Sequence, residues 1–216
     1  SRPSSPGITT SSAAWSRPRN LPPPIRSFIS YVTAGSGHRR AAEAVADAVQ
    51  QRLPGATVWC QDFLADVPWW LRRAYPWTYE VLVRRVPAGW GVLYGLFDNT
   101  AIFRLAQPLR RWWNCLVSRR FLHRLVRERP DLLIATHFFP ADVAAAAKRT
   151  HGLPTRLVVV ITDLFPHRFW LVPEADAVVV GSEHTKAICQ QRGADAARLH
   201  VLGTPIQERF YPPQNR

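Results

Sequence analysis

The stretch Phe28–Glu43, FISYVTAGSGHRRAAE, contains three local patterns that together decide the fold. Six residues of β-type apolar sequence lead into Ala34–His38, and a run of helix-forming residues follows directly. This order predicts a strand, a tight glycine turn and the first turn of a helix. Backbone N–H groups and the positive end of a helix dipole meet at such a turn, which therefore suits an anion or an oxyanion.

A histidine, His38, stands at the mouth of this turn. Histidine is the side chain best suited to moving a proton near neutral pH. The Gly-x-Gly pattern of residues 35–37 does not continue into a dinucleotide-binding fingerprint, because Arg40 occupies the place of its third glycine. A Walker loop is disfavoured too, since no lysine precedes Lys148. The turn is either an ordinary strand–helix connection or a site for another ligand.

Composition favours a folded domain with a large core. The chain has 216 residues, of which 47% are hydrophobic and nine are tryptophan. Its formal net charge of +13 is carried almost entirely by arginine. Three cysteines, odd in number and far apart, fit neither a zinc site nor a disulfide framework, which predicts a reducing compartment. The uncharged run 86–97 is too short and too rich in glycine to cross a membrane.

Apolar β-branched runs alternate with helical segments from residue 27 onward. Strands are predicted at 27–33, 56–60, 131–136, 156–161, 176–181 and 198–202. Helices are predicted at 38–53, 69–85, 101–129 with a bend at Pro108, 140–150 and 183–192. Strand sequences such as LVVVIT are apolar throughout, as expected for a parallel sheet covered on both faces. The predicted fold is α/β, a doubly wound, mostly parallel sheet of the Rossmann-like type, with ligands beyond the C-terminal strand ends.

Two segments depart from this repeat. Residues 1–26 hold six serines, six prolines and no acid, and are predicted to be a disordered tail. The domain proper is assigned to 27–203, with a basic, tryptophan-rich helical insertion at about 63–129. Residues 68–130 contain twelve arginines against three acids and six of the nine tryptophans.

Arginine beside tryptophan on amphipathic helices suits a membrane interface, where indole sits at headgroup depth and guanidinium meets phosphate. The same mixture could stack single-stranded nucleic acid, or the tryptophans could be core and the arginines a solvated face. We favour the membrane and expect no nucleic-acid partner. The predicted membrane-binding residues are Trp69, Trp70, Arg72, Arg73, Trp77, Trp112 and Trp113.

Polar residues also follow two other predicted strands. Asp163 comes shortly after LVVVI, where a carboxylate can accept a substrate hydroxyl, orient a histidine or cap a helix. His137 follows LLIAT and is either a site residue or a histidine packed at a helix start. No metal-binding cluster is predicted.

Four segments together resemble one family. They are the glycine turn with His38, PDLLIATHFFP at 130–140, ITDLFPHRFW at 161–170 and the closing run VVVGSEHTKAICQQRGADAARLHVLGTPIQERF at 178–210. This combination resembles the N-terminal domain of the monogalactosyldiacylglycerol synthase and processive diacylglycerol glucosyltransferase family, over about residues 27–211.

The resemblance implies a GT-B glycosyltransferase. In such an enzyme the N-terminal half binds the membrane and diacylglycerol, and the C-terminal half binds most of the UDP-sugar. Residues 204–216 would begin the interdomain linker, and the C-terminal donor domain is expected as a partner beyond them. A peripheral membrane protein on the cytoplasmic face is expected, bound to anionic lipid, with UDP-sugar as donor substrate and no cofactor.

The implied reaction is inverting transfer of a hexose to the primary hydroxyl of diacylglycerol. His38 is the predicted base, or the group that positions the acceptor, and Asp163 is the second catalytic candidate. The predicted substrate-binding residues are Gly35, Ser36, Gly37, His137, His167 and Trp170. Plant galactosyltransferases of the family carry an aspartate where Thr33 stands, which argues against a plant-type galactosyl enzyme. A non-catalytic lipid-binding or membrane-docking module is the rival function.

Overall fold

A computed structural model describes residues 24–86, 89, 91, 95 and 99–210, so most of the predicted tail and the end of the predicted linker lie outside the described residues. Within the described part, one six-stranded parallel sheet has the order β2-β1-β3-β4-β5-β6. The strands are β1 Arg26–Tyr31, β2 Thr57–Asp62, β3 Leu132–Ala135, β4 Arg156–Val160, β5 Ala177–Val180 and β6 Leu199–Val201. The six predicted strands are therefore confirmed, with ends shifted by two residues at most.

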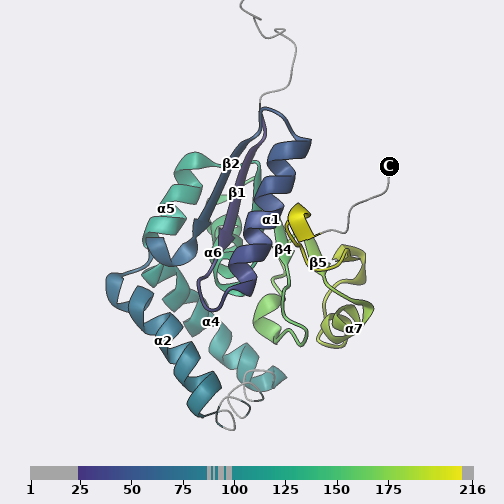
Figure 1. Cartoon of the computed structure of the whole chain (residues 1–216). Helices are drawn as coiled ribbons and strands as arrows, with labels where there is room; N and C mark the ends of the chain where they lie inside the picture. The colour runs from purple at the N-terminus through teal and green to yellow at the C-terminus, as the bar shows by residue number, and fades with distance from the viewer. Residues whose placement is uncertain (1–23, 87–88, 90, 92–94, 96–98, 211–216) are drawn as a thin grey trace, which may run out of the picture.

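Helices cover both faces of this sheet (Figure 1). They are α1 Gly37–Arg52, α2 Trp69–Arg85, α4 Thr100–Val117, α5 Arg119–Glu128, α6 Phe138–His151 and α7 Glu183–Gln191. Short 3-10 helices are η1 Phe63–Asp66, η2 Arg168–Trp170, η3 Ala196–Arg198 and η4 Glu208–Phe210. The predicted doubly wound α/β fold is confirmed. None of the described helices is both long and apolar enough to cross a bilayer.

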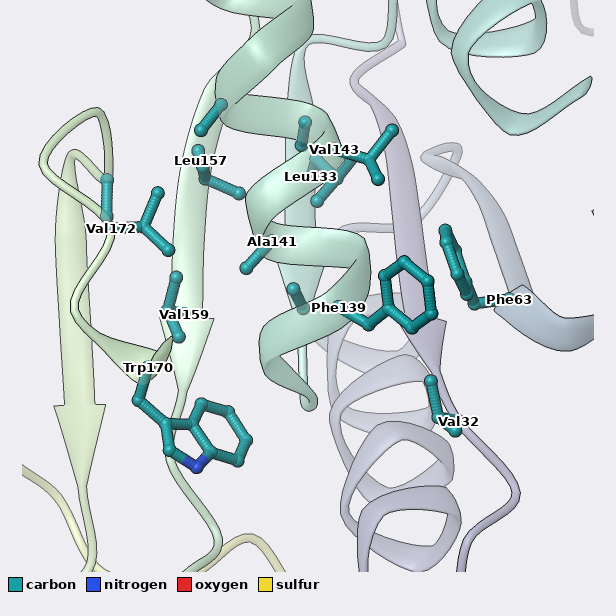
Figure 2. Packing of buried hydrophobic residues seen from close by; sticks show 14 of the residues in the cluster. Val32, Phe63, Leu133, Phe139, Ala141, Val143, Leu157, Val159, Trp170 and Val172 are labelled. Atoms are coloured by element: carbon teal, nitrogen blue, oxygen red, sulfur yellow. The ribbon is translucent and has the colours of Figure 1, made fainter. Parts of the chain in front are cut away.

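Alternation along the strands divides the core into two layers. On one face, Ile29 and Ile134 pack against Ala42 of α1. The opposite face carries the larger layer, to which α5, α6 and η1 contribute. Figure 2 shows Phe139 of α6 turned toward Phe63 of η1, with their ring centroids 4.6 Å apart.

The ends of the predicted insertion at 63–129 are part of this main core. Phe63 of η1 and both Phe121 and Leu125 of α5 are fully buried in the larger layer. The tryptophan-rich helix α2, in contrast, has no buried residue. Figure 1 shows α2 and α4 together at the lower end of the molecule, where the rings of Trp70 and Trp113 lie 6.3 Å apart.

The prediction of a single helix over 101–129 was wrong. Pro108 lies inside a continuous α4, and the helix is interrupted ten residues later at Ser118, which is buried and leaves the helical conformation. The two halves have different surroundings, because α5 buries Phe121 under the sheet whereas α4 leaves much of its surface exposed. The break at Ser118 lets α5 pack against the sheet while α4 keeps its exposed surface.

A buried carboxylate holds α4 against α6. Asp142 of α6 accepts hydrogen bonds from Arg110 Nη2 at 3.0 Å and from Asn114 Nδ2 at 2.8 Å. The Arg110 guanidinium also lies 4.6 Å from the ring centre of Phe169 in η2. This clamp fixes the position of α4 while its outer face remains uncovered by the described residues.

We expect Asp142→Ala to lower the free energy of unfolding by about 3 kcal/mol, because removing one partner leaves the buried Arg110 charge uncompensated. Urea unfolding followed by circular dichroism measures this. Asp195→Asn is the matched control, since it removes an exposed ion pair with Arg198 and should cost less than about 1 kcal/mol. Equal losses in the two variants would contradict a stabilising clamp.

Candidate active site

Three strand ends that are distant in sequence meet at one edge of the sheet. The strands β1, β3 and β4 are neighbours and parallel, so their C-terminal ends lie side by side. They deliver His38, Thr136 and Thr162 to the same place. Ligands of doubly wound sheets bind at this edge.

His38 is joined to the neighbouring strand end by two hydrogen bonds that run in opposite directions. Its Nδ1 lies 2.9 Å from the carbonyl oxygen of Thr136, and the Thr136 hydroxyl donates to the His38 carbonyl, also at 2.9 Å. The Thr162 hydroxyl is 2.7 Å from the same Nδ1. The imidazole is thereby fixed in position and in orientation.

These contacts select the form of the ring. A carbonyl oxygen only accepts hydrogen bonds, so the short contact with Thr136 places the proton on Nδ1 and leaves the lone pair on Nε2. Burial lowers the pKa of His38 below its usual 6.5, against the opposing influence of the Asp163 carboxylate and the Thr136 hydrogen bond. His38 is therefore neutral at pH 7 and able to accept a proton.

Asp163 is held by an indole. Its Oδ2 accepts a hydrogen bond of 2.8 Å from Trp170 Nε1, and Trp170 is wholly buried. Figure 2 shows Trp170 next to Val159, near the C-terminal end of β4. The Trp170 ring also lies 6.0 Å from the His38 ring. Trp170, which was predicted to bind substrate, therefore hydrogen-bonds Asp163 and packs against His38.

His137 is packed at the start of α6, which was one of the two roles that the sequence left open for it. Its Nδ1 accepts the Phe139 N–H at 3.1 Å, and only 3% of the residue is exposed. The ring packs edge-on against His38 at 4.8 Å between centroids. Burial, and then the proximity of His38 and His167, hold the pKa of His137 well below 6.5. A neutral His137 thus forms part of the wall behind His38.

The remaining predicted substrate-binding residues are more accessible. Gly35 has a left-handed backbone (φ +88°), and a Cβ added at Gly35 or Gly37 would meet no atom within 4 Å. Ser36 is exposed, and its side chain does not cap α1. His167 is partly exposed and accepts the Phe169 N–H at 3.2 Å at the start of η2. The open face of the turn leaves room for a ligand.

Three neighbours of His38 and Asp163 were missed as site residues. Thr136 and Thr162 each precede a residue that was chosen, and their strand-end position was the available signal. Tyr75 of α2 lies with its ring 6.2 Å from that of His137, and its pKa is raised by burial and, more weakly, by the Tyr79 and Asp163 charges. No sequence pattern connects Tyr75 to the glycine turn, because the contact depends on how α2 packs.

The predicted membrane-binding residues form an exposed surface on α2 and α4. Trp69, Trp70, Trp77, Trp112 and Trp113 are all substantially exposed, as are Arg72 and Arg73. A core role for these five tryptophans is therefore excluded. Sequence reasoning missed the apolar stripe of α4, formed by Leu105, Leu109 and Trp112 with exposed fractions of 83%, 68% and 59%. Their spacing places them on one helix face.

Within the described residues, no group of three histidine, cysteine, aspartate or glutamate side chains lies close enough to hold a metal ion.

A solved structure supports the fold assignment. The lipopolysaccharide outer core galactosyltransferase WaaB, a GT-B enzyme, superposes with a TM-score of 0.52 and 15% sequence identity. The superposition covers 89% of this chain and 49% of that one, so the two proteins share this fold over about half of the WaaB chain.

Curated relatives share sequence as well. The processive diacylglycerol β-glucosyltransferase of Bacillus cytotoxicus is 28% identical over 118 residues, which cover 55% of this chain and 30% of the relative. Monogalactosyldiacylglycerol synthase 1 of Arabidopsis thaliana is 25% identical over 195 residues, 88% of this chain and 36% of the relative. The chain thus spans about a third of the length of these relatives. The sequence profile of the monogalactosyldiacylglycerol (MGDG) synthase family matches residues 38–206, and the chain belongs to this family.

Proposed function

We propose that the chain is the acceptor-binding and membrane-binding part of an enzyme that transfers a hexose from a UDP-sugar to diacylglycerol. The observation that carries the proposal is His38, a neutral histidine held by Thr136 and Thr162 at the ligand-binding edge of the sheet. The named activities of the two relatives and the family match support the reaction type.

In the proposed step His38 is the general base. Its Nε2 takes the proton of the acceptor's primary hydroxyl as that oxygen attacks the anomeric carbon of the sugar. The bond from this carbon to the UDP oxygen breaks, UDP leaves with the bonding electrons, and the configuration inverts. The imidazolium that forms is stabilised by the Asp163 carboxylate, whose charge already favours protonation of His38.

A donor-binding half is the proposed partner. Gly35 and Gly37, without side chains to obstruct the approach, would let the turn come close to the UDP-sugar diphosphate. The leaving diphosphate would be stabilised by helix N-termini and by groups of the other half, with no cofactor. Thr33 argues against a plant-type galactosyl enzyme.

Peripheral binding at the cytoplasmic face of a membrane is the proposed location. The exposed indoles and the apolar stripe would enter the interface, while Arg72 and Arg73 meet anionic headgroups. The described cysteines are free, which fits the reducing compartment expected from their spacing.

In the complete gene product, His38→Ala should lower kcat by roughly 10²–10⁴, the usual contribution of a positioned general base. Activity of the unmodified enzyme should fall on the acid side, below pH 6.5, because burial lowers the His38 pKa from that value and protonation removes the base. The variant should lose this acid limb. A pH–rate profile of both proteins gives the comparison.

Exposed His200 provides the matched control, since His200→Ala should leave kcat and the pH–rate profile unchanged. Melting curves should show that both variants stay folded at the assay temperature. A folded His38→Ala enzyme with near-normal turnover would move the base assignment to Asp163. If the unmodified protein binds lipid but transfers no hexose, and His38→Ala changes neither property, the non-catalytic lipid-binding module is favoured.

The apolar stripe should contribute directly to vesicle binding. Replacing Leu105 and Leu109 together by serine should lower recovery of the chain in liposome flotation at least about tenfold, because each buried leucine contributes roughly 1.5–3 kcal/mol. Binding to anionic vesicles should also weaken at high salt, where headgroup attraction is screened.

Leu202→Ser with Ile206→Ser is the control pair, because both residues are exposed and lie outside α2 and α4. This pair should float like the unmodified chain. Equal loss in both doubles would contradict the assignment of the surface. Equal recovery on neutral and anionic vesicles, insensitive to salt, would contradict its electrostatic part.

A further inference from the structure

The segment that carries Asp163 has no regular structure of its own. Residues 161–167, here called the Asp163 loop, form neither helix nor strand between β4 and η2. The Asp163 side chain is held by Trp170 Nε1 at 2.8 Å, but that bond does not place the backbone of the loop. The position of the loop is therefore set by its contacts with neighbouring elements.

The helix α7 makes such contacts at two carbonyl groups of the loop. Thr185 Oγ1 donates a hydrogen bond of 3.3 Å to the carbonyl oxygen of Leu164, and Arg192 Nη1 donates to that of Pro166. Leu164 directly follows Asp163 in the chain, and Pro166 comes two residues later. The two bonds thus hold the backbone immediately after the carboxylate.

The loop and η2 contact α7 in return. Arg168 Nη1 of η2 donates a hydrogen bond of 3.0 Å to the carbonyl oxygen of Arg192, and the Phe165 ring packs edge-on against that of His184 at 5.5 Å. Thr185 is only 2% exposed, so its hydroxyl is fixed by the surrounding packing. The Asp163 loop is therefore held at both ends of α7.

The position of this loop matters because Asp163 acts on His38. The Asp163 carboxylate raises the pKa of His38 against the effect of burial, and such an interaction weakens with distance. His137, at the start of α6, is the titratable ring that packs against His38 from the neighbouring strand end. If the loop moved away, the imidazolium formed in the proposed step would lose its stabilising carboxylate.

A second arginine makes the same kind of contact elsewhere. Arg198 Nη1 donates to the carbonyl oxygens of Pro173 and Ala175 at 2.7 Å and 3.0 Å. These carbonyls follow η2 and lie outside the Asp163 loop. Arg198 thus provides a comparison in which guanidinium–carbonyl bonds are lost while the loop keeps its contacts.

From these contacts we infer that Arg192 and Thr185 are positioning residues of the site, which act through the loop backbone to hold Asp163 beside the His38 imidazole. Charged donors such as guanidinium form stronger hydrogen bonds than neutral ones, so Arg192 carries the larger share. The inference rests on the proposed function, because it takes His38 as the base and Asp163 as the carboxylate that stabilises its protonated form.

Kinetics of the complete gene product test the inference. Arg192→Gln should lower kcat about 10- to 100-fold, since displacing a positioned group by about 1 Å can cost this much. The KM for the UDP-sugar should stay within about twofold, because the lost interaction belongs to the transition state. The acid limb of the pH–rate profile should move to lower pH, because the carboxylate that raises the His38 pKa is displaced.

Three further variants separate positioning from general stability. Arg198→Gln is the matched control and should leave kcat and the acid limb unchanged. Arg192→Lys keeps a charged donor and should recover most of the lost kcat. Thr185→Val removes the second contact without a change of charge and should act like Arg192→Gln, but more weakly. If Arg192→Gln and Thr185→Val both match Arg198→Gln in kcat and acid limb, the inference is overturned.

A titration that needs no transfer activity gives a second readout. NMR of the protein with isotope-labelled histidine follows the His38 ring, whose signal is assigned by its loss in His38→Ala. His38 should titrate at lower pH in Arg192→Gln than in the unmodified protein, and at the same pH in Arg198→Gln. An equal midpoint in all three proteins would contradict the positioning role.

The two assays distinguish this inference from the proposed function. If the unmodified enzyme transfers no hexose to diacylglycerol, the proposed function fails, and the titration still decides whether α7 positions Asp163. If transfer depends on His38 while the Arg192 and Thr185 variants match the control in both assays, only the positioning assignment fails.

Discussion

The reciprocal hydrogen bonds between His38 and Thr136 are the interaction on which the rest of the site depends. They join the β1–α1 turn to the end of β3, so the imidazole position is set by the sheet itself. One bond also decides which ring nitrogen holds the proton. A histidine on a mobile loop would offer the same chemistry, but neither its tautomer nor its direction would be fixed.

Electrostatics separate this site from the remainder of a strongly basic chain. Burial lowers the pKa of His38 and of His137 and so favours their uncharged forms. The Asp163 carboxylate raises the His38 pKa, and the Trp170 indole holds this carboxylate by a hydrogen bond. Arginine is abundant on the helices that carry the exposed tryptophans. A neutral base beside an oriented carboxylate suits proton removal from a hydroxyl, whereas exposed guanidinium groups suit attraction to anionic headgroups.

The sheet could be predicted from sequence because buried parallel strands leave a direct signal. Runs such as Leu157–Val160 are apolar at every position, and the polar residues after them mark the strand ends. The break at Ser118 could not be predicted, because it follows from the tertiary packing of Phe121 and from the Asp142 clamp. Proline was the expected breaking point, yet Pro108 is accommodated in the continuous helix.

Side-chain roles were harder to predict than positions. Trp170 and His137 were predicted to bind substrate, but the structure buries both: Trp170 donates a hydrogen bond to Asp163, and His137 packs against the His38 ring. Tyr75 was not among the predicted site residues. Which face of α2 turns inward is decided by contacts with residues more than sixty positions away, such as His137 and Phe139.

The helix α2 carries residues of both the proposed membrane surface and the surroundings of the site. Around α2, Trp69 and Trp77 face solvent, Tyr75 packs toward His137, and Val83 lines a groove beside the glycine turn. Because all four belong to one helix, the depth at which the indoles sit in an interface also sets the distance from the bilayer to His38. Under the proposed function, a lipid acceptor would then need to rise from the membrane only as far as the glycine turn, which limits how much of its acyl chains water can reach.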